Sequence, residues 1–207
     1  MEKEITLTFH NEGLRSYIEL DLCRECPRQD RKGCCGWYSP VWYPLDLAFV
    51  YKTHPATLDY VWSLSRLTVL DTSVTINNLP ESESYQCRFH QKEGGCVIPQ
   101  HLREGICRQF VCIGVNWQAE PSLSRWVQFF DRLTDYEIAV NDRLSARLTQ
   151  GGYTLRDPAR REEFMQALMP WYEEEMRHPP AFFTDVPAAE TVKIRRTIEK
   201  FGTEWVL

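Results

Sequence analysis

The chain has 207 residues, of which 43% are hydrophobic and 26% charged, which is typical of a folded globular protein and excludes wholesale disorder. Its formal net charge of -5 argues against a basic surface that binds nucleic acid, so we expect no nucleic-acid partner. The N-terminus lacks the apolar core of a signal peptide, and no stretch approaches the roughly eighteen apolar residues of a membrane span. We therefore expect a cytoplasmic protein with no membrane partner.

The first half of the chain predicts a mixture of short strands and helices. Residues 4–9 alternate apolar side chains with threonine, and residues 17–22 repeat this period of two more weakly, which predicts an N-terminal β-hairpin. A proline suited to a first helical turn precedes residues 45–51, where we expect a short helix, and a second helix is expected over residues 55–70. Residues 73–76 predict one strand within a polar loop.

The second half of the chain predicts one more hairpin and then helices. A glycine pair divides residues 87–98 into two short apolar runs, which predicts a small hairpin with a cysteine near each end. Residues 121–150 repeat apolar side chains at the helical period and form the longest expected helix. A further helix should follow Asp157-Pro158 and be stopped or kinked at Pro170. A last helix is expected from about Pro187 to the stop at Gly202. Its apolar stripe would comprise Thr191, Ile194, Ile198 and Phe201.

These elements predict an α+β fold, mostly α, in which small β-hairpins surround a cysteine metal core that C-terminal helices cover. Residues 1–120 would form the cysteine-cluster metal-binding region, and residues 121–207 a helical extension packed on it. The length suits one domain that contains both parts.

The eight cysteines fall into two compact groups of four with the spacings C-x2-C-x7-C-C and C-x8-C-x10-C-x4-C. The predicted metal ligands are Cys23, Cys26, Cys34, Cys35, Cys87, Cys96, Cys107 and Cys112. Thiolates are preferred by zinc and by iron–sulfur clusters, and a cytoplasmic protein keeps its thiols reduced. Disulfides and inert buried thiols are the alternatives, but only metal binding explains the grouping.

The neighbours of the cysteines suit a metal centre. Basic side chains around the first group would favour the thiolate form, and these are Arg24, Arg28, Arg31 and Lys32. Four aromatic side chains either wall the metal off from water or join the core, and these are Trp37, Tyr38, Trp42 and Tyr43. His54 is expected to be structural, and His90 and His101 are expected to support or flank the site rather than to bind the metal.

The cysteine count leaves the metal open between two choices. If each zinc ion is bound by four thiolates, the eight cysteines would bind two separate ions, whereas one [4Fe–4S] cluster needs only four thiolates. The side chains of Cys34 and Cys35 diverge because the residues are adjacent, so a cluster or two sites would accommodate them more easily than one tetrahedral ion. We therefore favour an iron–sulfur cluster slightly over zinc.

The order of the cysteines, the adjacent pair and the segment Tyr43-Pro44-Leu45-Asp46 resemble the bacterial CxxCxxCC cysteine-cluster family, described as zinc- or iron-chelating proteins. The resemblance covers about residues 20–115 and implies that all eight cysteines are candidate ligands. The chain departs from the family at Arg103-Glu104, where an Arg-Pro is common, and in the seven residues before Cys34.

A more distant resemblance is to the cysteine-rich part of flagellin lysine methylases, which use S-adenosylmethionine. It implies an enzymatic alternative with a protein substrate or client, although the sequence identifies no catalytic residue. A thiol redox protein that cycles Cys34-Cys35 or Cys23/Cys26 is a second alternative, but the C-x-x-C lacks the βαβ context of such proteins.

Overall fold

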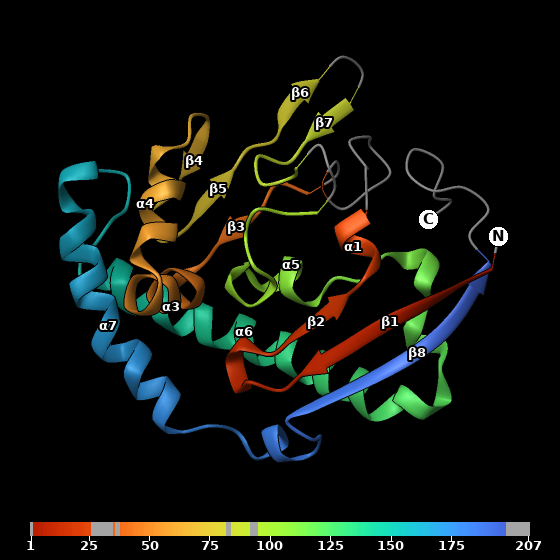
Figure 1. The fold of residues 1–207 in the computed structure, drawn as a ribbon. Coiled ribbons are helices and arrows are strands. Elements are labelled where there is room, and N and C mark those ends of the chain that lie inside the picture. Colours follow the sequence, from red (N-terminus) through yellow and green to blue (C-terminus); the bar gives the residue numbers. More distant parts are fainter. Residues whose placement is uncertain (1, 26–34, 36–37, 82–83, 92–94, 198–207) are drawn as a thin grey trace.

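The structure is a computed structural model, shown in Figure 1. The residues that it describes are 2–25, 35, 38–81, 84–91 and 95–197. Of these, 53% are helical and 20% lie in strands, so the predicted α+β fold that is mostly α is confirmed. Among these residues no helix has both the length and the apolar character needed to cross a membrane.

The helices are α1 (Leu22–Glu25), α3 (Pro44–Thr53), α4 (Pro55–Ser63), α5 (Gly105–Gln109), α6 (Ser124–Gln150) and α7 (Arg161–Arg177). The strands are β1 (Glu2–His10), β2 (Tyr17–Leu20), β3 (Val41–Trp42), β4 (Leu67–Val69), β5 (Val74–Ile76), β6 (Leu79–Glu81), β7 (Ser84–Gln86) and β8 (Ala189–Thr197). Short 3₁₀ helices lie at Gly13–Arg15, Gln100–Leu102, Ile113–Val115, Trp117–Ala119, Pro121–Leu123, Pro158–Arg160 and Ala181–Thr184.

The predicted N-terminal hairpin is confirmed as β1 and β2, which pair antiparallel with Leu7 opposite Leu20. Strand β1 is the centre of a three-stranded sheet with the order β2-β1-β8. Its alternate side chains Ile5, Leu7 and Phe9 are fully buried, as the period of two requires of a sheet with one covered face.

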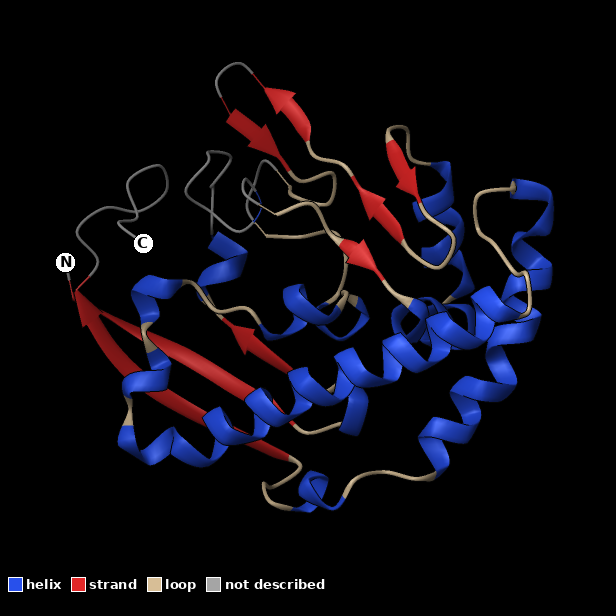
Figure 2. Ribbon diagram, turned by 180° about the vertical axis from the view of Figure 1, so that it is seen from behind, coloured by secondary structure: helices blue, strands red, loops and turns tan. Residues whose placement is uncertain are grey.

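Helix α6 covers this sheet, and Figure 2 shows it lying across the strands. The ring of Phe9 lies 5.1 Å from that of Trp126 and 6.3 Å from that of Phe130, both on α6. Trp117, just before α6, lies 5.0 Å from Phe9. The contacts between β1 and α6 therefore form an aromatic centre of the core, which agrees with the helix predicted over residues 121–150.

The prediction of a last helix from about Pro187 is wrong for the described residues, which form a strand. Residues Ala189–Thr197 form β8, which pairs antiparallel with β1 along its whole length, with Ile5 opposite Ile194. Exposure alternates along β8, and β-branched side chains, which favour strands, occur at Thr191, Val192 and Ile194. The rest of the predicted helix, including Ile198, Phe201 and Gly202, lies outside the described residues.

The second predicted helix is correct only in its first half. Helix α4 ends at Ser63, and Arg66 adopts the left-handed conformation with φ of 64°, which a helix cannot continue through. Residues Leu67–Val69 then form β4, which pairs with β5. Strand β5 confirms the strand predicted over residues 73–76, and the sheet has the order β3-β5-β4.

The hairpin predicted over residues 87–98 is present among the described residues only as a short antiparallel pairing, and residues 92–94 of its predicted turn lie outside them. A separate hairpin, formed by β6 and β7, lies upstream of Cys87. Within the predicted span, the described residues form an isolated bridge between His90 and Cys96, and the amide of Val97 donates to the carbonyl of Phe89 at 2.8 Å. The amide of Cys87 donates to the carbonyl of Cys35, so it does not extend the pairing between His90 and Cys96.

Helices α3 and α7 confirm the helices predicted at 45–51 and after Asp157-Pro158. Pro44 occupies the first turn of α3, where its missing amide costs nothing. Pro170 does not stop α7, which runs unbroken from Arg161 to Arg177.

Candidate metal centre

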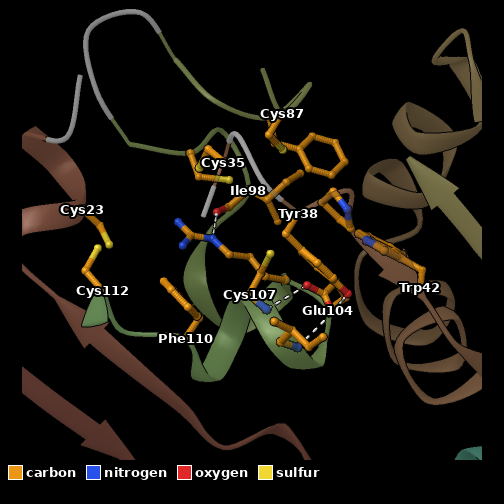
Figure 3. A pocket seen from close by; sticks show the side chains of 15 residues that line it. Cys23, Cys35, Tyr38, Trp42, Cys87, Ile98, Glu104, Cys107, Phe110 and Cys112 are labelled. Atoms are coloured by element: carbon orange, nitrogen blue, oxygen red, sulfur yellow. Dashed lines mark hydrogen bonds between the residues drawn. The ribbon is translucent and has the colours of Figure 1, made fainter. Parts of the chain in front are cut away.

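One small cavity, of about 70 Å³, brings together the cysteines that the structure describes (Figure 3). Those that line it are Cys23, Cys35, Cys87, Cys96, Cys107 and Cys112. They come from both groups in the sequence, which are separated by about fifty residues of β3, α3, α4 and β4–β7. Cys26 and Cys34, the other two predicted ligands, lie outside the described residues.

The first cysteine group contacts the second directly. The amide of Cys87 donates a hydrogen bond of 2.6 Å to the carbonyl oxygen of Cys35. Cys23 lies in α1, which follows β2, and its side chain points toward that of Cys112 in Figure 3. The sheet and this backbone bond therefore place the two groups on the same cavity.

The second cysteine group is positioned by short turns. Cys96 lies in the bridge with His90, and Gly95 before it has φ of 81°, a conformation that favours glycine. Cys107 lies in α5, and its carbonyl accepts from Gln100 Nε2 at 3.0 Å. The carbonyl of Cys112 accepts from the amide of Val115 at 2.9 Å. Hydrogen bonds to their backbone carbonyl groups thus help to fix the positions of Cys107 and Cys112.

Glu104 is a buried carboxyl that caps α5 beside the cysteines. Its two oxygens accept from the amides of Cys107 and Ile106 at 2.8 and 2.9 Å, which satisfies the first turn of the helix. Burial, with repulsion from Asp46, raises the pKa of Glu104 to about 7. Tyr38 Oη donates to Glu104 at 3.4 Å, and burial raises the pKa of this tyrosine. Glu104 is a functional candidate that the sequence did not single out.

Aromatic side chains wall the cavity as predicted, although not all of those expected. Tyr38 and Trp42 line it, together with Phe89 and Phe110. Tyr43 is 44% exposed and lines a different pocket, so its predicted place beside the metal is wrong. Trp37 lies outside the described residues.

The described cation at the cavity is Arg103, whose Nε donates to the carbonyl of Ile98 at 2.9 Å. A guanidinium beside thiols favours the thiolate form, which is the form that binds metal. The predicted cations Arg28, Arg31 and Lys32 lie outside the described residues, and the side chain of Arg24 is not described.

The histidines do not line the cavity. His90 is buried next to it, in the bridge with Cys96, as expected of a supporting residue. His101 faces the rings of Tyr17 and His54 at 6.2 and 5.9 Å. Burial, followed by repulsion from His54, lowers the pKa of His101.

Two buried ion pairs connect the elements around the cysteine cavity. Arg108, beside Cys107 in α5, is 1% exposed and donates to Glu137 of α6 and to the carbonyl of Ser16. Arg15 donates to Asp46 of α3 at 2.6 Å. Burial raises the pKa of Glu137, against the opposing effect of Arg108, and burial lowers the pKa of Arg15 to about 10. These pairs connect α5, α6, α3 and the turn after β1.

Within the described part of the chain, no three His, Cys, Asp or Glu side chains are placed to hold one metal ion. The chemistry of the donors nevertheless fits a metal, because the cavity is lined by six cysteines and one arginine side chain. Its volume of about 70 Å³ is far below the roughly 300 Å³ at which pockets for organic cofactors begin, so an ion or small cluster fits better.

No protein-family model, curated protein or solved structure matches the chain. The function therefore has to be argued from the geometry and chemistry of the cysteine cavity itself.

Proposed function

We propose that the protein is a metalloprotein that binds an iron–sulfur cluster or zinc through its two cysteine groups. The observation that supports this most strongly is the meeting of cysteines from both groups at one cavity. Core packing alone does not require such a meeting, since cysteine is usually retained for its chemistry rather than for its shape. The proposed ligands are drawn from all eight cysteines, with Cys26 and Cys34 completing the set.

An iron–sulfur cluster is the slightly favoured metal group. Six cysteines from both groups line the cavity. The side chains of Tyr38, Trp42 and Phe110 also line it and would limit the access of water and oxygen to a cluster. Zinc held by four thiolates is the alternative, and it would divide the cysteines between two ions. We also propose the cytoplasm as the compartment, because reduced thiols are needed to bind either metal group.

The test is purification in the absence of air followed by elemental analysis, acid-labile sulfide determination and a visible spectrum. A brown protein with stoichiometric iron and sulfide would support the cluster. A colourless protein with stoichiometric zinc would support the zinc alternative. A protein with neither metal would contradict the proposal.

Methyl transfer from S-adenosylmethionine is the second candidate. One observation favours it, since a pocket of about 380 Å³ beside the cysteine cavity has the volume of a site for an organic cofactor. Equilibrium dialysis with labelled S-adenosylmethionine tests it. Saturable binding, with methyl transfer to an added protein substrate, would establish an enzyme; absence of binding would remove this candidate.

A further inference from the structure

A wide groove adjoins the cysteine cavity and has a volume of about 910 Å³. It lies between the N-terminal hairpin of β1 and β2 and the segment from Gly95 to Arg103. Thr6 and Thr8 line it, and they alternate along β1 with buried side chains such as Leu7. Because successive side chains of a strand point to opposite faces, the groove is built on the face of the sheet that α6 does not cover.

The groove meets the cavity at two cysteines. Cys23 and Cys96 line both spaces, together with Ile98 and Arg103. The pocket of about 380 Å³, which also adjoins the cavity, is lined by no cysteine among the described residues. Of these two neighbouring spaces, the groove is therefore the one that leads to cysteine side chains.

The cavity and the groove differ in what they can admit. At about 70 Å³ the cavity suits an ion or a small cluster, whereas the groove lies within the range of about 300–1,000 Å³ that is usual for organic ligands. The aromatic rings of Tyr38, Trp42 and Phe110 line the cavity but not the groove. A small molecule that carries metal would therefore stop in the groove, and the metal would pass to or from it beside Cys23 and Cys96.

The charges of the groove favour a cation. Among the described residues, its lining carries the carboxylates of Glu19 and Asp21 and the guanidinium of Arg103. Asp21 accepts one backbone amide at 2.9 Å and Glu19 contacts the ring of His10 at 3.3 Å, and both carboxylate side chains remain exposed. His101 also lines the groove, and burial lowers the pKa of this histidine, so its ring is mostly neutral at pH 7. An excess of negative charge along a cleft raises the local concentration of cations.

We infer that this groove is the path by which a metal ion enters and leaves the cysteine cavity, with Cys23 and Cys96 as the first and last thiols that it meets. The inference rests on the proposed metal binding and adds to it a direction of exchange. A metal site that exchanges its ion needs such an entry path. The ion is delivered to the polar face of the N-terminal hairpin and removed from it by a small carrier.

The rate at which EDTA removes metal from the protein as purified tests this path, with the bound metal measured by elemental analysis after desalting. Thr8→Trp places an indole ring in the groove and should lower that rate several-fold. Thr191→Trp is the matched control, because Thr191 lies opposite Thr8 on β8, its hydroxyl lies 3.0 Å from that of Thr8, and it does not line the groove. Both variants lose this hydrogen bond, so Thr191→Trp should release metal at the wild-type rate. Ile138→Trp, which fills the pocket of about 380 Å³ instead, should also release metal at that rate.

A second measurement identifies the thiols that face the groove. Brief treatment of the same protein with N-ethylmaleimide, followed by peptide mapping, should modify Cys23 and Cys96 before Cys87 and Cys107, which line only the cavity. Thr8→Trp should slow the modification of Cys23 and Cys96.

The outcomes separate this path from metal binding itself. A metal-loaded protein in which Thr8→Trp releases metal at the wild-type rate, or in which Ile138→Trp or Thr191→Trp slows release as much as Thr8→Trp, would overturn the path and leave metal binding intact. Earlier modification of Cys87 or Cys107 would overturn the path as well. A wild-type protein that carries no metal would overturn the proposed function and this inference with it.

Discussion

Replacing Glu137 with leucine should destabilise the protein by about 4 kcal/mol, since breaking a buried ion pair typically costs about 3–5 kcal/mol. Arg108 is 1% exposed, and Glu137 is its carboxylate partner. Leucine fills a similar volume, so the loss arises mainly from the uncompensated charge of Arg108 and from the lost acceptor of Gln109. The loss is a large fraction of the about 5–15 kcal/mol by which most domains are stable.

The assay is urea unfolding at 25 °C and pH 7, followed by tryptophan fluorescence. The double variant Arg108→Met/Glu137→Leu should recover most of the loss, because an apolar pair leaves no buried charge. Glu174→Gln, which removes an exposed partner of Arg147, should leave the unfolding midpoint unchanged. A loss below about 1 kcal/mol for Glu137→Leu would show that the pair is not desolvated and would refute the reasoning.

Three further predictions concern the bound metal, the pairing of strand β8, and the pH dependence of the stabilisation that Glu190 of β8 provides. Removal of metal with a strong chelator should lower the melting temperature by at least about 5 °C, because metal that binds only the folded state stabilises it; full metal loss with an unchanged melt would contradict a structural site. Ile194→Lys should destabilise by about 2–4 kcal/mol in urea unfolding, because it places a charge at a buried position of β8; a neutral effect would contradict the strand. Glu190 accepts hydrogen bonds from Trp126 Nε1 and Arg125, and these bonds lower its pKa below 4.5. Its contribution to the free energy of unfolding, about 1–2 kcal/mol, is therefore present above pH 4.5 and is lost as the pH falls through the lowered pKa. The stability difference between wild type and Glu190→Gln should therefore shrink in acid, and a difference independent of pH would show that the charge is not involved.

The sequence predicted those elements in which local pattern and tertiary environment agree. Residues 4–9 alternate because one face of β1 is buried, and α6 repeats apolar side chains because one stripe packs on the sheet. Over residues 189–197 two periods coexist: Thr191 and Ile194 fit a helical stripe, while Val192 and Ile194 fit a strand. Pairing with β1, 183 residues away at Thr8, decides between them, and no local pattern contains that information.

The cysteine spacing predicted two groups that lie together, and the six described cysteines do line one cavity, but the spacing did not predict their surroundings. Arg103 and Glu104 belong to the cavity through the fold of the turn before α5, and in the sequence they appeared only as a departure from a family pattern. The pair Arg108–Glu137 was not predicted at all, since the residues are 29 positions apart and each resembles a solvated charge.

X-ray absorption at the metal edge of the anaerobically purified protein tests the central claim most directly. We expect stoichiometric metal with sulfur in its first coordination shell, at about 2.3 Å if the metal is zinc. Cys107→Ser and Cys35→Ser, which alter one cysteine of each group, should both diminish the bound metal. Absence of metal, or a shell of oxygen and nitrogen alone, would contradict the account.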